Sequence, residues 1–243
     1  MRKMRFSIGN KPVLISRFIN LLYPSECPIC SNSTDNLAFA PICTLCWSGI
    51  KKYSGPSCRI CSSPFASEEA EICSACMKKP PLFSLAMSFG IYDGALAEAI
   101  NIYKFHGIKR LYRPLGKLLL EFDLTGFDTV VPVPLSHRGL RDRGFNQSLL
   151  LAKAISSKAK VPLISDRLRK IRETPPQIGL NSKERTANLK GAFRVNGKFA
   201  GMRILLIDDV MTTGATANEC SKQLLKAGAS DVTVLTLARA SSL

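Results

Sequence analysis

The sequence predicts an α/β protein in which a parallel sheet flanked by helices follows a small N-terminal zinc-binding module. Two observations carry this prediction. Apolar runs of strand length alternate with helical patterns in the C-terminal part of the chain, which is typical of parallel sheets. Eight of the nine cysteines fall into four C-x-x-C pairs ahead of that part. We therefore expect a double zinc ribbon over residues 21–80 and a sheet domain over residues 82–243.

The expected elements of the sheet domain alternate along the chain. The expected strands are Leu85–Tyr92, Thr129–Val133, Ile204–Ile207 and Asp231–Leu237. The expected helices are Ala95–Tyr103, Leu115–Phe122, Gln147–Ser157 and Glu219–Lys226. The short, wholly apolar character of the second and third strands is typical of buried parallel strands. Pro80 and Pro81 form a stiff connector ahead of the first strand.

The cysteine pairs have the spacing of zinc ligands. They are Cys27/Cys30, Cys43/Cys46, Cys58/Cys61 and Cys73/Cys76. Each pair can place two thiolates on one metal from a tight turn, so four pairs supply two structural zinc sites of four thiolates each. The segments between the pairs are too short and polar to form a core, and zinc should hold them together. Consecutive pairing gives two successive ribbons, but a cross-braced arrangement fits the spacing as well.

The rest of the sequence favours reduced cysteines. The apolar residues near the N-terminus, where Pro12–Leu22 is expected to form a short amphipathic helix, are interrupted by Lys11, Arg17 and Asn20. A signal peptide is therefore not expected, and no apolar run reaches the ~18 residues of a membrane helix. We expect a cytoplasmic protein without a membrane span, a setting in which disulfides are rare. The ninth cysteine, Cys220, is expected to be a small buried apolar residue.

The segment Leu205–Ala217, LLIDDVMTTGATA, is the most informative part of the chain. A buried strand leads into two carboxylates, a turn of small residues and a helix, and open α/β sheets bind ligands at such strand ends. The turn can wrap its N–H groups and hydroxyls around a phosphate at the helix N-terminus. The residues of this phosphate loop are Thr212, Thr213, Gly214, Ala215 and Thr216. Asp208 and Asp209 stand beside it as acceptors that suit the vicinal hydroxyls of a sugar phosphate.

An ordinary strand-to-helix turn is the alternative interpretation of this segment. Thr216 and Glu219 have the spacing of a helix capping box. Asp208 would then cap the helix or be solvated. The two interpretations agree for Thr216 and Glu219 and differ only for the acidic pair.

Positive charge is concentrated in one stretch of the chain. Between Arg138 and Arg203, sixteen basic residues stand against four acidic ones, so this stretch carries +12 of the net charge of +16. Such polarity attracts polyanions, whether pyrophosphate, nucleic acid or both. A solvated basic surface is the alternative. The aromatic residues that could stack on nucleic-acid bases are Trp47, Tyr53, Phe105 and Phe145.

Further ligand contacts are expected where the second strand ends. Val133 and Pro134 begin a stiff loop, and Arg143 stands at the start of a helix, where its guanidinium can pair with a phosphate. Alternatively, Asn146 only caps that helix and Phe145 belongs to the core.

Two other polar segments have less defined roles. Lys104 and His106 follow a helix and receive no role beyond substrate contact. Thr174–Gln177 contains two prolines in a stretch without periodicity and could be a loop that closes on a ligand. Asn181–Glu184 fits a helix capping box instead.

The acidic pair and the phosphate loop resemble the phosphoribosyl pyrophosphate loop of type I phosphoribosyltransferases. The resemblance implies that Asp208 and Asp209 bind the ribose 2- and 3-hydroxyls as the catalytic pair, and that Thr212–Thr216 binds the 5-phosphate. It also implies that the loop at Val133 and Pro134 contacts pyrophosphate, that Mg²⁺ accompanies it, and that the sheet domain has the type I phosphoribosyltransferase-like fold.

Six motifs, in their order along the chain, resemble the ComF/GntX family. They are YKFHG at Tyr103–Gly107, VPVPL at Val131–Leu135, RGFNQ at Arg143–Gln147, RETPPQ at Arg172–Gln177, ER to GAF at Glu184–Phe193, and DDVMTTGAT at Asp208–Thr216. The four cysteine pairs resemble the zinc-binding region of that family, so the resemblance covers the chain from about Leu21. It implies a cytosolic bacterial protein of DNA uptake and use.

Three functions follow as hypotheses. The first is a competence protein that handles incoming single-stranded DNA and binds phosphoribosyl pyrophosphate with Mg²⁺. The second is a phosphoribosyltransferase that transfers the 5-phosphoribosyl group to an unidentified acceptor. The third, compatible with the first, is an adaptor whose zinc module docks a DNA-uptake helicase or a recombination mediator. No residue pattern identifies an acceptor pocket, so enzymatic turnover does not follow from the sequence.

Overall fold

The structure, a computed structural model, describes residues 26–66, 69–174 and 182–240 of the 243-residue chain. The chain divides into two compact units between Ile50 and Lys51. The helix expected at Pro12–Leu22 lies outside the described residues, as do the expected loop after Thr174 and Asn181 of the expected capping box. Within the described ranges, no helix has the length and apolar character needed to cross a membrane.

The described part of the first unit contains little regular structure. The N–H of Cys27 donates to the carbonyl of Asn32 (2.8 Å) and closes a tight turn. The helix α2 (Thr44–Ser48) begins within the second cysteine pair, and the rings of Phe39 and Trp47 stack with centroids 5.2 Å apart. A segment this small buries too little apolar surface to fold alone, so metal ligation must supply most of its stability.

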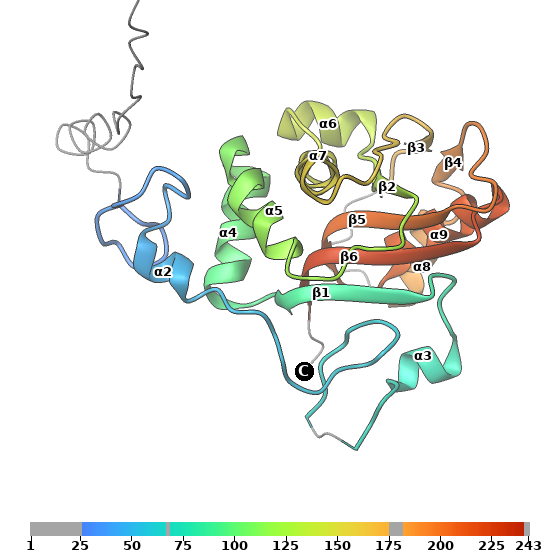
Figure 1. The fold of residues 1–243 in the computed structure, drawn as a ribbon, viewed down its shortest axis with the longest axis horizontal. Coiled ribbons are helices and arrows are strands. Elements are labelled where there is room, and N and C mark those ends of the chain that lie inside the picture. Colours follow the sequence, from blue (N-terminus) through green and yellow to red (C-terminus); the bar gives the residue numbers. More distant parts are fainter. Residues whose placement is uncertain (1–25, 67–68, 175–181, 241–243) are drawn as a thin grey trace, which may run out of the picture. The chain divides into compact units, whose positions relative to one another are not determined.

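The second unit is built on a four-stranded sheet in the order β1-β6-β5-β2 (Figure 1). The strands are β1 (Leu85–Ile91), β2 (Thr129–Pro132), β5 (Arg203–Met211) and β6 (Asp231–Arg239). All pairings in this sheet are parallel. The two central strands are largely buried, as their apolar runs require when both faces of a sheet are covered. The predicted fold class is confirmed.

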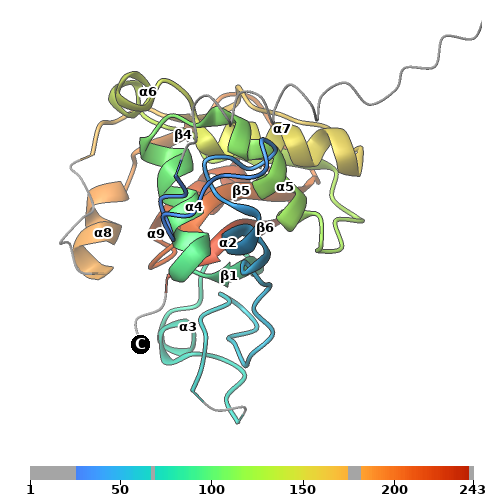
Figure 2. The same ribbon diagram turned by 90° about the vertical axis from the view of Figure 1, so that its left-hand side faces the viewer.

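Helices cover both faces of this sheet (Figures 1 and 2). On one face lie α4 (Gly94–Phe105), α5 (Tyr112–Leu119) and α7 (Gln147–Ala159). On the other lie α8 (Ser182–Leu189) and α9 (Ala215–Lys226). The alternation of side chains along β5 explains the division: Ile204 and Leu206 belong to the same core cluster as Cys220 and Leu224 of α9. Cys220 is fully buried, as expected.

The second cysteine group belongs to the same compact unit as the sheet. Its first turn is hydrogen-bonded to the edge strand β1, because the N–H of Ala86 donates to the carbonyl of Ile60 (2.7 Å) and the hydroxyl of Ser62 donates to the carbonyl of Ala86 (2.6 Å). The helix α3 (Ser74–Lys78) begins within the last cysteine pair. These contacts cover part of a sheet edge whose backbone groups would otherwise lack partners.

One expected boundary is wrong at the candidate site. The strand β5 continues beyond Ile207 to Met211, because β6 pairs with it as far as the Met211–Arg239 register. Asp208 and Asp209 therefore lie within a strand and not after its end.

Two helices begin earlier than expected. The helix α9 begins at Ala215, directly after Gly214, whose φ of 76° ends the loop in the left-handed region. The helix α5 begins at Tyr112 and ends at Leu119. Pro114 is tolerated in its first turn because the N–H groups of a first turn have no helical partner.

Some elements were not predicted. They are α6 (His137–Arg143), the short helix at Lys109–Leu111, β3 (Leu168–Lys170) and β4 (Phe193–Val195). The last two form an antiparallel pair outside the main sheet. A three-residue strand is too short for an alternating pattern, and α6 has no buried residue and hence no apolar stripe.

Candidate functional site

Two groups of four cysteines each could hold a metal ion. They are Cys27, Cys30, Cys43 and Cys46 in the first unit, and Cys58, Cys61, Cys73 and Cys76 in the second. The sulfurs of each group lie within 4.8 Å of one another. Sulfurs around a tetrahedral zinc are about 3.8 Å apart, since each Zn–S bond is about 2.3 Å long.

Individual distances fit zinc and exclude disulfides. The Sγ atoms of Cys30 and Cys43 are 3.6 Å apart, as are those of Cys61 and Cys73, whereas a disulfide needs about 2.05 Å. Ligand pairs that follow one another in sequence meet in one group, so the pairing is consecutive and the cross-braced alternative is wrong. The chain therefore has two structural zinc sites of the zinc-ribbon type.

Backbone N–H groups prepare Cys58 as a thiolate ligand. Burial raises the pKa of its thiol, but hydrogen bonds from the N–H groups of Cys73, Cys61 and Ile60 outweigh this and lower the pKa to about 7. The Cys73 N–H lies 3.3 Å from the Cys58 sulfur. Zinc binds the deprotonated form, so these donors favour ligation at neutral pH.

The phosphate loop connects β5 to α9. Thr212 and Thr213 precede Gly214, which is the N-cap of the helix, and the Ala215 N–H donates to Thr213 Oγ1 (3.4 Å). The loop lines a pocket together with parts of β5 and β6. The lining residues are Asp208, Val210–Ala217, Val234 and Thr236. A small-residue loop at the positive end of a helix offers N–H groups and hydroxyls to an anion.

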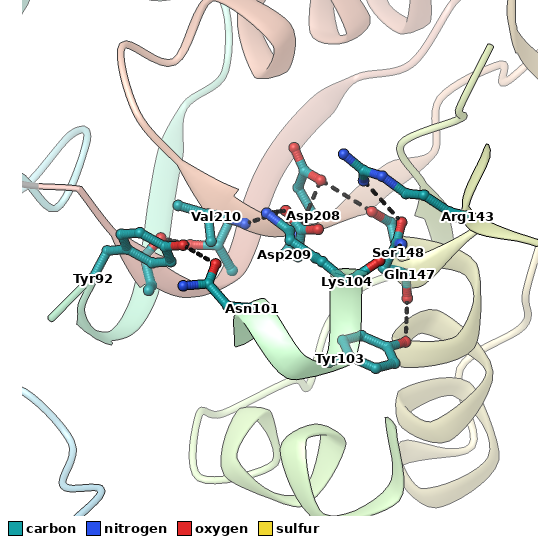
Figure 3. A network of polar contacts seen from close by, with 12 residues as sticks. Tyr92, Asn101, Tyr103, Lys104, Arg143, Gln147, Ser148, Asp208, Asp209 and Val210 are labelled. Carbon is teal, nitrogen blue, oxygen red and sulfur yellow. Dashed lines mark hydrogen bonds and ion pairs between the residues drawn. The ribbon is translucent and has the colours of Figure 1, made fainter. Parts of the chain in front are cut away.

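The two carboxylates beside this loop have different partners (Figure 3). Asp209 pairs with Lys104 of α4 at 2.9 Å, and both side chains are largely buried, at 10% and 14% exposure. Asp208 accepts hydrogen bonds from the Ser148 hydroxyl (3.0 Å) of α7 and from the Asp209 N–H (2.9 Å).

Asp208 is closely surrounded by protein, although part of its side chain remains accessible. Burial, followed by the charge of Asp209, raises its pKa to about 7, against the opposing effects of Lys104 and the Ser148 hydroxyl. The carboxyl therefore keeps its proton to a higher pH than an ordinary aspartate does. A neutral carboxyl can donate as well as accept a hydrogen bond.

Lys104 and Ser148 are site residues that the sequence did not reveal as such. Lys104 was assigned only a substrate contact, and its signal was its place in the YKFHG motif. Ser148 follows the RGFNQ motif directly. Both meet the acidic pair only because the C-terminal end of α4 and the first turn of α7 lie over the same part of β5 (Figure 3).

A polar network ties these two helices together. The Tyr103 hydroxyl donates to the carbonyl of Gln147 (2.9 Å), and the Arg143 guanidinium donates to the side-chain oxygen of Gln147 (3.2 Å). The guanidinium also lies over the Phe105 ring, 5.3 Å from its centroid. Arg143 is thus joined to the acidic pair through α7 (Figure 3).

The loop after β2 lies beside the acidic pair as well. The Val133 N–H donates to the carbonyl of Ile207 (2.9 Å), one residue before Asp208. Asn146 does cap α7, accepting from the Leu149 N–H (3.2 Å), and its amide donates to the carbonyl of Val133 (3.1 Å). These bonds hold Val133 at the carboxyl end of the parallel strands, where the phosphate loop also lies. Pro134 follows it.

The basic residues between Arg138 and Arg203 differ in whether their side chains can contact a polyanion. Arg138 and Arg141 are exposed on α6. The Arg138 guanidinium makes a solvent-exposed pair with Asp142 at 3.7 Å, and the Arg138 N–H donates to Glu173 (3.0 Å). The Arg172 guanidinium instead donates to the carbonyls of Asn188 (2.8 Å) and Lys190 (2.9 Å). Its guanidinium therefore holds the C-terminal end of α8 in place. Among the aromatic candidates, Phe145 is buried, whereas Phe105 is 65% exposed.

Fold and sites together define a protein with a parallel α/β sheet domain and an N-terminal double zinc ribbon. A family model described as a double zinc ribbon domain matches residues 18–77. Competence protein F of Haemophilus influenzae is 33% identical over 224 residues, which span 87% of this chain and 96% of that protein. DNA utilization protein YhgH of Salmonella typhimurium is 32% identical over 90% of this chain and 99% of its own length. The chain belongs to the ComF family.

More distant similarities are found as well. Competence protein ComFC of Bacillus subtilis is 29% identical over 82% of this chain and 84% of its own. Among solved structures, orotate phosphoribosyltransferase from Aeropyrum pernix matches 56% of this chain and 63% of its own, with a TM-score of 0.34 and 22% identity. Purine phosphoribosyltransferase from Pyrococcus horikoshii matches 58% and 79%, with a TM-score of 0.33 and 17% identity.

Proposed function

We propose that this chain binds phosphoribosyl pyrophosphate with Mg²⁺ at the loop between β5 and α9, and that it handles single-stranded DNA during DNA uptake in the cytoplasm. One observation carries the first part. An acidic pair on β5 leads directly into a small-residue loop that ends at a helix N-terminus. This combination suits a sugar phosphate, because the loop recognises the phosphate and the carboxylates recognise the hydroxyls.

Each part of the site has a role in this proposal. Thr212–Thr216 binds the 5-phosphate. Asp208 and Asp209 accept hydrogen bonds from the ribose hydroxyls. The loop at Val133 and Pro134 lies beside them and contacts the pyrophosphate, whose oxygens also bind Mg²⁺.

Lys104 makes the acidic pair compatible with a polyanionic ligand. Two adjacent carboxylates would repel pyrophosphate, but the ion pair between Lys104 and Asp209 neutralises one of the charges. The raised pKa of Asp208 reduces the other charge at neutral pH. Arg143 adds a cation near the start of α7, and its guanidinium matches phosphate geometry.

The DNA-handling part is supported by charge and by relatives. The chain carries a net charge of +16, and α6 presents exposed arginines. Relatives that match most of its length are named competence protein F and DNA utilization protein. A helicase or recombination mediator as the partner of the zinc ribbons stays a prediction.

Phosphoribosyl transfer to a small acceptor is the alternative. Within the part of the chain that the structure describes, the lining of the pocket at Asp208 contains no aromatic side chain that could stack on a nucleobase. A transferase would release pyrophosphate from phosphoribosyl pyrophosphate when its acceptor is added, whereas a binding protein would not.

The test is titration calorimetry of the full chain with phosphoribosyl pyrophosphate and Mg²⁺. The wild type should bind, and Asp208→Asn with Asp209→Asn should lose at least about tenfold in affinity, since hydrogen bonds to charged groups contribute about 1.5–3 kcal/mol each. Asp231→Asn is the matched control, because this acid begins β6 at the opposite end of the sheet. Absence of binding by the wild type, or equal affinity in the double variant, would refute the proposal.

A further inference from the structure

Arg239 touches both the second zinc site and the strand that carries the phosphate loop. It is the last residue of β6 and is only 8% exposed. Its Nε donates to the carbonyl of Cys61 (3.0 Å), and one terminal nitrogen lies 4.0 Å from the Cys61 sulfur. The other terminal nitrogen donates to the carbonyl of Met211 (3.0 Å), the residue that precedes Thr212.

A buried guanidinium needs an opposing charge. Within the ranges that the structure describes, no carboxylate forms an ion pair with Arg239. A zinc ion bound by four thiolates has a net charge of about −2, since each ligand is deprotonated. The zinc-loaded group of Cys58, Cys61, Cys73 and Cys76 therefore supplies the charge that keeps Arg239 in place.

Arg239 also defines where the phosphate loop begins. The carbonyl of Met211 accepts from Arg239 and from the N–H of Ala240 (2.9 Å). The Met211 side chain is buried at 3% exposure. A planar guanidinium donates in fixed directions, so its contact with the zinc site constrains its contact with Met211.

We propose that Arg239 is a positioning residue that couples zinc binding at the second cysteine group to phosphate binding at Thr212–Thr216. The proposal rests on the proposed phosphoribosyl pyrophosphate site. Loss of zinc removes the opposing charge and frees Cys61, so the guanidinium no longer holds Met211 and the loop loses order. Coupling is reciprocal, so the ligand must in turn strengthen zinc binding.

The first arm of the test measures ligand affinity by calorimetry in the full chain. Arg239→Met should weaken binding of phosphoribosyl pyrophosphate about tenfold, within the usual range of such couplings. Cys73→Ser, which opens the second zinc site, should weaken it similarly, and the double variant should be no weaker than either. Arg203→Met is the matched control. This arginine begins β5, the strand that ends at Met211, and its side chain is more than half exposed.

The second arm measures zinc release to a chelator in a Cys46→Ser background, which leaves one intact four-cysteine group. Phosphoribosyl pyrophosphate should slow release about tenfold when Arg239 is present and should not slow it in Arg239→Met. Arg239→Lys should keep zinc bound, because it keeps the charge, but should lose the ligand effect, because an ammonium lacks the fork that spans both carbonyls.

The third arm needs no ligand and separates the coupling from the proposed function. Amide hydrogen exchange in Thr212–Thr216 should rise in Arg239→Met and in the zinc-depleted wild type, and stay at the wild-type level in Arg203→Met. If this holds but the wild type binds no phosphoribosyl pyrophosphate, the proposed function fails, whereas the coupling of the second zinc site to the order of Thr212–Thr216 stands. If the wild type binds the ligand, but loop exchange and zinc release are the same in Arg239→Met, the coupling is overturned.

Discussion

Asp208 is the residue at which the proposed ligand binding and stability conflict. Burial and the neighbouring Asp209 raise its pKa to about 7 from an ordinary value of 3.8. A carboxyl that binds its proton more tightly in the folded state favours folding below pH 3.8. This contribution is lost progressively as the pH rises to 7, because only the unfolded chain ionises freely. Residues kept for function at such a cost are expected in binding sites.

Asp208→Asn should therefore raise the thermal stability of the protein, and more at pH 8 than at pH 5. The extra gain at pH 8 should be about 2 kcal/mol, because the amide removes a carboxyl that resists ionisation in the folded state. Calorimetric melting at the two pH values measures it. A fall in Tm at pH 8 would show that the carboxylate is not destabilised there.

Asp123→Asn is a control of opposite sign. The N–H of Thr125 donates to Asp123 (2.9 Å) and lowers the pKa of that carboxyl. The Asp123 carboxylate stabilises the folded state above its ordinary pKa, and this stabilisation is lost as the pH falls below that value. Its removal should therefore lower Tm by similar amounts at pH 5 and pH 8.

Lys104 is the second residue whose charge matters. Lys104→Met should destabilise the protein by about 3–5 kcal/mol, because it leaves Asp209 buried without its partner beside a second carboxyl. The double variant with Asp209→Asn should recover much of this loss, since no unpaired charge remains. Denaturant unfolding of the three variants measures the coupling. Equal stability of Lys104→Met and the wild type would mean that the pair contributes nothing.

At the scale of elements, the arginines of α6 differ in their contacts from Arg172, which follows β3. Arg138 and Arg141 of α6 are exposed, whereas Arg172 is engaged with backbone carbonyls. An arginine whose guanidinium is not engaged by the protein can neutralise a DNA phosphate and so release counterions from the DNA. The basic stretch is therefore not one uniform surface, and a charge variant at Arg172 would confuse stability with binding.

Arg138→Gln with Arg141→Gln should weaken binding of single-stranded DNA and reduce its salt dependence. Each lost phosphate contact should lower the magnitude of the log–log slope by about 0.7. Lys153→Gln with Lys158→Gln is the control of equal charge, because these exposed residues lie farther along α7. Fluorescence anisotropy over a salt series measures the slope. An equal loss in both double variants would assign the effect to net charge alone.

At the scale of the whole molecule, the boundary at Ile50 divides the two zinc sites between the two units. The second site is hydrogen-bonded to β1 and to Arg239, and so belongs to the sheet. The first site has only its own short segment to stabilise, and zinc contributes most of its folding energy.

The full chain should contain two zinc ions, and a fragment from Lys51 to Leu243 should contain one. The fragment should still bind phosphoribosyl pyrophosphate, because all residues of the proposed site lie within it. Elemental analysis and calorimetry check the two expectations. A fragment with one zinc that does not bind, while the full chain binds, would give the first unit a direct part in the site.

Local spacing was enough to predict several features from the sequence alone. The four C-x-x-C pairs identified the metal ligands, because two thiolates three residues apart can reach one ion from a single turn. The apolar runs predicted the parallel sheet, and the sequence DDVMTTGAT placed acids, turn and helix in order. The extension of β5 to Met211 escaped prediction, because it depends on pairing with Arg239 in β6 and not on the residues of β5.

Only the tertiary structure decided which groups act on one another. The consecutive pairing of the cysteines could not be told from a cross-braced one by spacing. The Lys104–Asp209 ion pair and the contacts of Arg239 with Cys61 and Met211 join residues that are far apart in the sequence. The physical reason is the same in each case. A periodic pattern specifies the face on which a side chain lies, but charge pairing and burial depend on which other elements the folded chain brings against that face.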